Sequence, residues 1–513
     1  MHTDHAITPT AAPRPGTERI SPLELDGEEF RRLGHHLVDR IGDFLDSIRE
    51  RPVAPHTTPA ALRALLGDDT LPAGGSDAGA LLEQATTLLI EHSTFNAHPR
   101  FFGYITASAS PLGMLGDLLS SAMNPNVGAW SLSPMASEIE RQTVRWVADL
   151  IGFPRDCGGL FVSGGNMANI VCFMAARAAR AGWDVRKAGV STGPGSLVLY
   201  TSSATHTWVQ KASDICGLGT DAIRWIETDE HERMRVELLR DRIRADRAAG
   251  RVPFLVIGTA GSVSTGGIDP LAEIGAIAKD EGLWFHVDGA YGAPAAMLPD
   301  APADLAALSG ADSVAVDPHK WLYAPLEAAC ALVRDPESLR NAFSYHPPYY
   351  HFTGAEEDPP INFHEWGPQN SRGFRALKVW LAIRQVGREG YVRMIGDDIA
   401  LARLLHERVD AHPELEARTL GLSIATFRYV PAEMRDVASR DEEYLDRLNT
   451  ALLSRLQEGG ELYLSNAVLG GRFCLRACIV NFRTTARDIE ALPPIIAREG
   501  RALHESMRGG RSA

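Results

Sequence analysis

The chain has 513 residues, of which 45% are hydrophobic and 23% are charged, and its formal net charge is −14. At roughly 150 residues per domain this length predicts two to four domains, and the composition excludes fibrous, disordered and membrane-channel proteins. The balance of 51 basic and 65 acidic residues argues against a nucleic-acid partner, because phosphate binding needs a basic surface.

The first part of the chain predicts helices with no strand between them. Residues 1–20 carry acids, threonines and prolines but no apolar run, so we expect a disordered segment and no signal peptide. Apolar side chains at helical spacing predict a helix from residue 26 to about residue 49, and similar patterns lie near 59–66 and 79–92. Such helices have no sheet to cover them. This N-terminal arm, residues 1–105, is therefore expected to pack on another surface, in this chain or in a second copy.

From about residue 158 the pattern alternates between short apolar strands and helices. The predicted strands are 160–162, 197–200, 222–226, 254–259, 283–287 and 313–316. Helices are predicted between most of them, for example at 167–180, 234–247 and 271–281. This alternation predicts an α/β domain, residues 106–390, with a mainly parallel sheet that helices cover on both faces.

Beyond residue 390 the strands become few. A long helical stretch precedes a predicted strand at 423–430 and a helix at 442–457. Two more strands are expected at 461–465 and 473–481, with a last helix from about residue 486. Residues 391–513 therefore predict a small α+β domain.

The six cysteines indicate neither a metal site nor a disulfide framework. None forms a C-x-x-C pair, and a zinc site would need clustered ligands. We predict no metal, and we expect buried or idle thiols in a reducing compartment. Uncharged stretches such as 188–210 are too rich in glycine, serine and threonine to span a bilayer. These observations favour a cytoplasmic protein without a membrane partner.

Residues that follow each predicted strand are candidates for chemistry, because open α/β sheets bind ligands beyond the carboxyl ends of their strands. Ser163-Gly164-Gly165-Asn166 follows the first strand and opens a helix. Two glycines let an anion approach the backbone and a helix N-terminus attracts negative charge, so this turn could cradle a phosphate. A plain tight turn is the alternative. The spacing matches neither G-x-G-x-x-G nor a P-loop, so a nucleotide is not favoured.

Three ionisable residues follow other strands of the same sheet. Asp288 is either a turn or capping residue or a carboxylate that holds a ring nitrogen protonated. Lys320 stands among apolar neighbours, which favour an amine nucleophile that forms a Schiff base. His206 opens a helix and is either a capping or core residue or reaches into the same crevice. An anion cradle, a carboxylate and a lysine at successive strand ends are what pyridoxal phosphate requires.

Two segments carry a specific resemblance. Residues 286–292 (HVDGAYG) and 311–322 (ADSVAVDPHKWL) resemble the group II pyridoxal-phosphate-dependent amino-acid decarboxylases, which include the aromatic-L-amino-acid, histidine and glutamate decarboxylases. Further similar segments lie in family order at 98–104, 164–166, 205–206, 374–380 and 473–476, so the resemblance covers roughly residues 25–500. It implies fold type I of the pyridoxal-phosphate-dependent transferases, with a mainly parallel seven-stranded sheet. It also implies a homodimer whose active sites are shared between subunits.

The resemblance also implies roles for individual residues. Lys320 would form the Schiff base with the cofactor, and Asp288 would keep its pyridine nitrogen protonated. His206 would stack on the ring, position the substrate carboxylate and take part in proton transfer, and Thr259 would sit near the ring. The expected phosphate ligands are Gly164, Gly165, Asn166 and His319, with Asp317 nearby and Ser371 from a neighbouring subunit. The implied reaction converts an L-amino acid to its amine and CO2.

After CO2 leaves, a proton must reach the substrate Cα, and in the family a loop tyrosine supplies it. Alignment with the family favours Tyr349 here, with Tyr350 and Tyr345 as competitors, and packing of the loop is the alternative role for each. Relatives with a non-acidic residue at this position make aldehydes instead. A tyrosine therefore favours plain decarboxylation over oxidative decarboxylation and deamination.

The substrate is the least determined part of the prediction. The segment that begins with Tyr104 and Thr106 lacks the Phe-Pro of the best-known aromatic members and is one residue shorter, whereas Trp130 could offer an aromatic wall. Arg100 could meet an acidic side chain or be structural. We expect an aromatic amino acid, with acidic or diamino acids such as glutamate, aspartate or diaminobutyrate as alternatives. A nucleotide-binding oxidoreductase and a non-catalytic relative are the competing classes, and the intact Asp288 and Lys320 argue against the latter.

Overall fold

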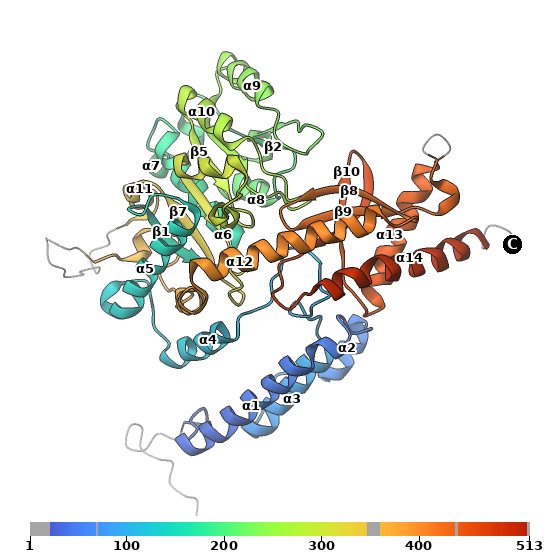
Figure 1. The fold of residues 1–513 in the computed structure, drawn as a ribbon. Coiled ribbons are helices and arrows are strands. Elements are labelled where there is room, and N and C mark those ends of the chain that lie inside the picture. The colour runs from blue at the N-terminus through green and yellow to red at the C-terminus, as the bar shows by residue number, and fades with distance from the viewer. Residues whose placement is uncertain (1–20, 68–69, 346–359, 437–439, 510–513) are drawn as a thin grey trace, which may run out of the picture. The chain divides into compact units, whose positions relative to one another are not determined.

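The computed structural model describes residues 21–67, 70–345, 360–436 and 440–509 (Figure 1). The chain forms two compact units, of which the first comprises residues 1–51 and 55–94 and the second residues 52–54 and 95–513. The predicted disordered segment 1–20 lies outside the described residues. The predicted boundaries at residues 105 and 390 remain predictions.

The first unit contains the three predicted helices, α1 (Gly27–Ser47), α2 (Pro59–Leu66) and α3 (Ala78–His92). The Asp26 carboxylate caps α1 by accepting the backbone N–H groups of Glu28 and Glu29 at 2.9 and 2.8 Å, which is how a side chain satisfies the free donors of a helix start. Helices α1 and α3 lie side by side, and His36 meets Glu83 across them at 2.7 Å.

The second unit is built on a seven-stranded sheet (Figure 1). Its strands are β1 (Gly158–Val162), β2 (Leu197–Ser202), β3 (Ile223–Ile226), β4 (Val252–Thr259), β5 (Trp284–Asp288), β6 (Ser313–Val316) and β7 (Ala329–Val333). The order is β1-β7-β6-β5-β4-β2-β3, and β7 is antiparallel to both β1 and β6 whereas the other pairs are parallel. This confirms the mainly parallel seven-stranded sheet. The six strands predicted from the pattern are present, and β7 was not predicted individually.

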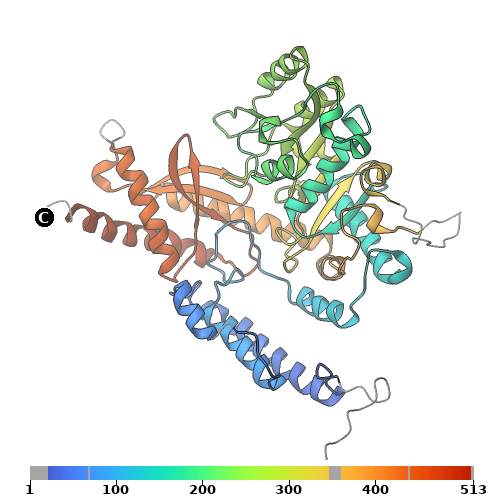
Figure 2. The ribbon, with the colours of Figure 1, turned by 180° about the vertical axis from the view of Figure 1, so that it is seen from behind.

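Helices cover both faces of this sheet, as expected (Figure 1; Figure 2 shows the opposite side). One core contains side chains of α5 (Pro134–Ile151), α9 (Val236–Ala248), α10 (Leu271–Glu281) and α12 (Ala376–Asp410). The other contains side chains of α6 (Gly165–Arg180), α8 (Trp208–Ile215) and α11 (Pro336–Phe343). Alternate residues of β5 serve the two cores, with Phe285 and Val287 in the first and Trp284 in the second, as the period of two along a strand requires.

The C-terminal part forms an antiparallel sheet of four strands in the order β10-β11-β9-β8. Its elements are β8 (Leu415–Gly421), β9 (Ile424–Tyr429), α13 (Glu442–Glu458), β10 (Ser465–Leu469), β11 (Arg472–Cys478) and α14 (Ala486–Gly509). The remaining helices are α4 (Pro111–Met123) and α7 (Val185–Ala188). Short 3-10 helices occupy Ile48–Glu50, Trp130–Leu132, Val190–Thr192, Thr220–Ala222, Ala293–Met297, Ala303–Gly310, Phe363–Glu365 and Ala432–Met434.

The strand predicted at 461–465 is wrong, and the strand there begins at Ser465. Leu462 and Leu464 are buried and alternate with polar residues, which resembles a strand. Tyr463 instead makes only an isolated bridge to Phe101. The strand starts where it can pair with β11 across the Gly470–Gly471 turn, in which both residues have positive φ.

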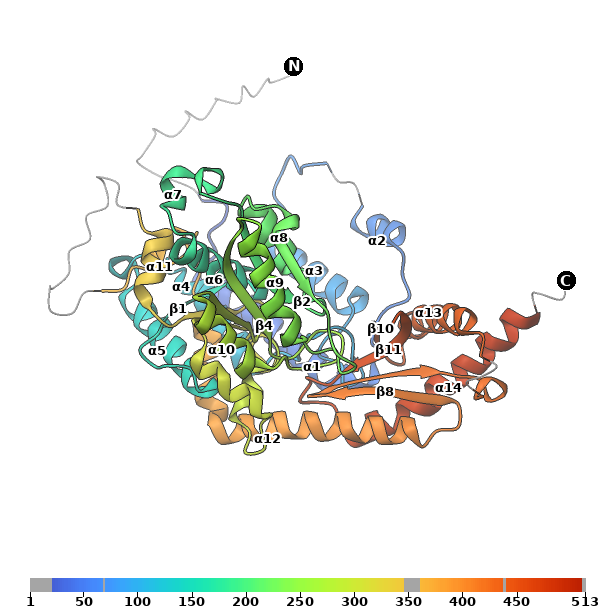
Figure 3. The ribbon, with the colours of Figure 1, turned by 90° about the horizontal axis from the view of Figure 1, so that it is seen from above.

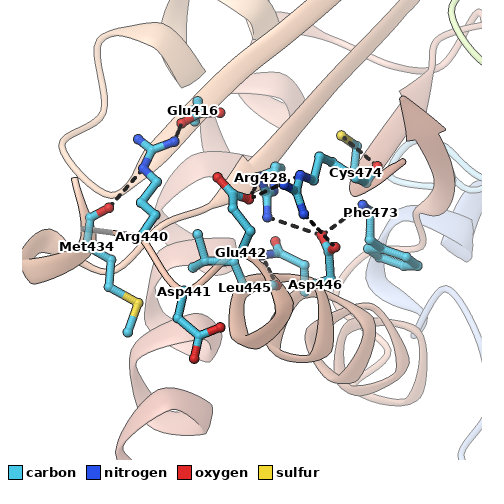
Figure 4. A network of polar contacts seen from close by, with 12 residues as sticks. Glu416, Arg428, Met434, Arg440, Asp441, Glu442, Leu445, Asp446, Phe473 and Cys474 are labelled. Atoms are coloured by element: carbon cyan, nitrogen blue, oxygen red, sulfur yellow. Dashed lines mark hydrogen bonds and ion pairs between the residues drawn. The ribbon is translucent and has the colours of Figure 1, made fainter. Parts of the chain in front are cut away.

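Arg428 anchors β9 to α13 through a buried ionic network (Figure 4). Its guanidinium, 1% exposed, donates to Glu442 at 2.8 Å and to Asp446 at 3.2 Å. Asp446 also accepts the backbone N–H of Phe473 at 2.9 Å, so one carboxylate holds β9 and β11 to the same helix. A buried cation needs such carboxylate partners, because leaving its charge unpaired costs several kcal/mol, roughly 3–5.

Helix α12 contacts α5 and the four-stranded sheet, so it spans both parts of the second unit (Figure 3). Non-helical backbone at Gly387 interrupts it. Further along, the buried Asp398 accepts the indole N–H of Trp321 at 2.8 Å and the hydroxyl of Tyr323 at 2.6 Å. Trp321 follows Lys320 directly, so α12 holds the segment that carries the candidate lysine.

Asp398 makes stability depend on pH in a defined direction. Burial raises the pKa of Asp398 to about 7, so the folded chain binds a proton that the unfolded chain releases near pH 4. The unfolded state therefore holds fewer protons between pH 4 and 7, and this group's contribution to stability falls as pH rises through that window, by up to about 4 kcal/mol. Relative to Asp398→Asn, the thermal midpoint of the wild type should drop between pH 5 and 8 at equal cofactor saturation. Parallel pH profiles of the two proteins would contradict this role.

Candidate active site

A cavity of about 440 Å³ opens at the carboxyl ends of the parallel strands of the large sheet. Eleven residues predicted from the sequence line it: Tyr104, Thr106, Gly164, Gly165, Asn166, His206, Thr259, Asp288, Asp317, His319 and Lys320. They come from segments up to 216 residues apart in the chain, and parallel strand ends bring most of them together.

The turn between β1 and α6 has the backbone of an anion cradle. Gly164 has a φ of 90°, which side-chain-bearing residues rarely adopt. A Cβ on Gly165 would lie 2.5 Å from Asp317 Oδ2, so only glycine fits beside that carboxylate. The Asn169 amide donates to the carbonyl of Gly165 at 2.9 Å and holds the first turn of α6 in place. The carbonyl of Gly164 accepts the N–H groups of Met167 and Ala168, so the backbone N–H groups of Gly165 and Asn166 precede the first bonds of the helix and can meet a phosphate.

Lys320, Asp317 and His319 form a compact group beside this cradle. The Lys320 ammonium lies 3.1 Å from Asp317 Oδ2, while Oδ1 of the same carboxylate is buried without a hydrogen-bond partner. His319 donates from Nδ1 to the carbonyl of Ala328 at 2.7 Å. Burial lowers the pKa of His319, whereas the Asp317 carboxylate 3.7 Å from Nε2 favours the protonated ring.

Asp288 ends β5 beside Thr259, its registered partner at the end of β4. Asp288 is buried, and its Oδ2 accepts the indole N–H of Trp208 at 2.7 Å. Thr259 is fixed by its backbone N–H, which donates to the buried Asp269 at 2.8 Å. The carboxylate is thus held at a strand end with its negative charge directed to the cavity that it lines.

His206 remains accessible at the cavity side, but the atoms packed around its ring desolvate it and lower its pKa. Its Nδ1 accepts the backbone N–H of Trp208 at 3.2 Å. The neutral ring therefore carries its proton on Nε2, as inferred from this hydrogen bond. A neutral imidazole can donate to a substrate carboxylate without adding charge.

Two predicted site residues in the described part of the chain, Ser371 and Trp130, do not line the cavity. Tyr349 lies outside the described residues. Ser371 is exposed and does not line the cavity. Trp130 lies elsewhere as well, where its indole N–H donates to Glu138 at 3.1 Å. Arg100, which could have met an acidic substrate, instead pairs with the buried Asp488 at 3.4 Å.

Several lining residues were not predicted from the sequence, among them Ile105, Asn169, Trp208, Val263 and Tyr291. Tyr291 stands in the HVDGAYG segment and could have been added from it. Trp208 gives no such signal, because a tryptophan in the first turn of a helix is most simply a core residue. Its contact with Asp288 depends on how β2 and β5 lie in the sheet.

Comparison with known proteins shows the family of the chain. Residues 59–470 match the family described as pyridoxal-dependent decarboxylase conserved domain. The chain belongs to this family. It is 35% identical over 468 residues to the aromatic-L-amino-acid decarboxylase of Bacillus atrophaeus, covering 91% of this chain and 94% of the relative. It is also 30% identical over 464 residues to a phenylacetaldehyde synthase of a Rosa hybrid cultivar, covering 89% and 90%.

Solved structures of the family are similar over nearly the whole chain. Oryza sativa TDC with PLP and tryptamine has a TM-score of 0.86 at 26% identity, covering 94% of this chain and all of that one. Mouse CSAD has a TM-score of 0.86 at 27% identity, covering 93% and 99%. The protein is thus a pyridoxal-phosphate-dependent amino-acid decarboxylase of fold type I, a carboxy-lyase.

The cavity fits this cofactor. The glycine turn and the start of α6 offer donors to a phosphate, and Asp288 offers an anion to a ring nitrogen. The partnerless Oδ1 of Asp317 leaves one buried acceptor open for a bound group. Within the described ranges, no group of three or more His, Cys, Asp or Glu residues is arranged to hold a metal ion. No helix in the described part of the chain is long and apolar enough to cross a membrane.

Proposed function

We propose that the chain decarboxylates an aromatic L-amino acid to the amine and CO2 at this cavity. The observation that carries the proposal is that Lys320, Asp288 and the Gly164–Gly165 turn line one cavity. Bound pyridoxal phosphate supplies an electron-accepting ring for the electron pair left behind when CO2 departs. Every other step falls to side chains of this chain.

Each residue has a task that suits its surroundings. Lys320 would hold the cofactor aldehyde, and Asp317, 3.1 Å from its Nζ, can exchange a proton with that amine. Asp288 balances the positive charge of the ring nitrogen. His206, neutral and donating from Nε2, orients the substrate carboxylate over the ring. The phosphate is bound by the backbone of Gly164, Gly165 and Asn166, by His319 beside Asp317, and by Ser371 of a second subunit.

The lining of the cavity supports an aromatic substrate. The described lining residues include Tyr104, Ile105, Thr106 and Val263 but no arginine, so an acidic side chain would find no guanidinium there. Among similar proteins are aromatic-L-amino-acid, tyrosine and tryptophan decarboxylases. Trp130 stays a proposed substrate contact only if a second subunit brings it to this cavity. Acidic and diamino acids remain the alternatives.

A product panel tests the substrate class. Purified protein saturated with pyridoxal phosphate is incubated with L-tyrosine, L-tryptophan and L-phenylalanine, and in parallel with L-glutamate, L-aspartate and L-2,4-diaminobutyrate. Products are identified by mass. Amines from the aromatic set support the proposal, whereas turnover confined to the acidic or diamino set overturns it. Oxygen consumption with ammonia release would instead indicate aldehyde formation, the activity that the names of the phenylacetaldehyde synthases describe.

Tyr349→Phe should shift the product from amine towards aldehyde. Without the phenol, protonation of Cα slows by about 10²-fold or more, and oxygen gains time to react at that carbon. The control is Tyr345→Phe. The ring of Tyr345 is exposed, and its centroid lies 4.3 Å from the Arg186 guanidinium. Tyr345→Phe should behave as wild type. An unchanged amine yield in Tyr349→Phe would assign the proton to another residue, with Tyr350 the next candidate.

A homodimer with shared active sites is also proposed. Helix α4 presents Leu115, Leu118, Leu119 and Met123 as exposed apolar side chains, and exposed apolar patches mark interfaces. Sedimentation at twice the chain mass of 55.7 kDa would support this assembly, and sedimentation at the single mass would reject it. The cytoplasmic location stays a prediction, which the six free and buried thiols support.

A further inference from the structure

Trp208 contacts both Asp288 and His206, the two ionisable groups that we propose to meet the cofactor ring. Its indole Nε1 donates to Asp288 Oδ2 at 2.7 Å, and its backbone N–H donates to His206 Nδ1 at 3.2 Å. The residue is 1% exposed and lines the cavity. Hydrogen bonds to an ionised acceptor are short and about twice as strong as neutral ones, and this distance is in that range.

The indole is itself held in place by β5. It meets the His286 ring edge-on, with centroids 5.8 Å apart and planes at 87°. His286 lies two residues before Asp288 and is fully buried, and burial lowers its pKa to about 4, so the ring is neutral. Its Nε2 donates to Asn169 at 2.7 Å, and Asn169 donates to the carbonyl of Gly165. The donor to Asp288 and the phosphate cradle are therefore braced by the same neutral histidine.

We propose that Trp208 is a positioning residue whose indole N–H keeps Asp288 an anion, so that the proton stays on the ring nitrogen of the bound cofactor. The inference rests on the proposed role of Asp288. A donated hydrogen bond stabilises the carboxylate and makes it a weaker base. Without that donor, Asp288 competes better for the proton it shares with the ring nitrogen, and the ring accepts electrons less well.

The test replaces Trp208 by phenylalanine, which keeps an aromatic ring and removes the donor. Trp284→Phe is the matched control, because Trp284 is also a buried indole of this sheet, donates to Ser313 at 2.8 Å, and does not line the cavity. Both variants and the wild type are loaded with pyridoxal phosphate labelled with ¹⁵N at the ring nitrogen. The ¹⁵N resonance reports directly how far that nitrogen is protonated, without any substrate.

In Trp208→Phe the resonance should move towards that of unprotonated pyridine, while in Trp284→Phe it should match wild type. With the substrate that the product panel identifies, kcat of Trp208→Phe should fall by about 10- to 100-fold. This is the usual effect on a rate of losing a hydrogen bond to a charged group. KM should change by less than about threefold, since the interaction serves the reaction rather than binding. Adding Trp208→Phe to Asp288→Asn should lower kcat no further, because the two act as a unit.

A wild-type resonance in Trp208→Phe, or a further loss in the double variant, would overturn the inference. If the phenylalanine variant does not fold, β-(3-benzothienyl)alanine at position 208 preserves the indole shape without its N–H and takes its place in the same measurement. If the wild type acts on no amino acid while the resonance still moves in the variant, the proposed substrate fails and the inference stands.

Discussion

Lys320→Ala is expected to abolish the covalent attachment of the cofactor and to lower the decarboxylation rate by about 10³-fold or more. Alanine offers no amine to the cofactor aldehyde, so the visible absorbance of the bound cofactor should shift to that of the free aldehyde. The phosphate cradle is untouched, so some cofactor should still bind. Absorbance spectra and initial rates at saturating pyridoxal phosphate measure both effects.

Lys279→Ala is the control for that variant. Lys279 is exposed on α10 and does not line the cavity, so its removal should leave spectrum and rate unchanged. Retention of wild-type rate and spectrum by Lys320→Ala would disprove the assignment of this cavity as the cofactor site.

Asp288→Asn is expected to lower kcat by about 10²- to 10³-fold while the cofactor remains bound through Lys320 and the cradle. The amide keeps nearly the same shape but carries no negative charge, so nothing holds the proton on the ring nitrogen. Trp208 would also face an amide in place of the anion it now donates to at 2.7 Å. The measurements are kcat, KM and the ¹⁵N resonance of the ring nitrogen in the variant and in the wild type.

Asp312→Asn provides a matched comparison. Asp312 accepts the backbone N–H of Phe285 at 2.8 Å, and Phe285 lies in β5, the strand that ends at Asp288. Asp312 does not line the cavity. Its replacement should affect stability and leave the resonance of the ring nitrogen unchanged. An Asp288→Asn protein with the kcat of wild type would show that charge at this position is not needed for the reaction.

The core of the site could be predicted because it depends on local rules. Parallel strands put their carboxyl ends at one edge, so Gly164, Asp288 and Lys320, each following a strand, had to meet there. The sheet itself followed from apolar runs alternating with helices. The strand β7 was missed although residues 328–333 form an apolar run, and the run does not specify its antiparallel place between β1 and β6.

The rest depends on contacts that no local pattern encodes. Trp208 became a site residue only because β2 and β5 stand on either side of β4 in the sheet. The segment around Leu462 had strand-like alternation but bridges to Phe101 instead of continuing a strand. Trp130 and Ser371 do not line the cavity of this chain, and the resemblance assigns Ser371 to a neighbouring subunit.

The most direct test of this account is to find which lysine holds the cofactor. The chain has only five lysines, Lys187, Lys211, Lys279, Lys320 and Lys378. Borohydride reduction of the protein with bound pyridoxal phosphate fixes the pyridoxyl group on its amine, and peptide masses then locate it. We expect the label on Lys320 alone. A label on another lysine, or an active protein that takes up no label, would contradict the assignment of this cavity as the active site.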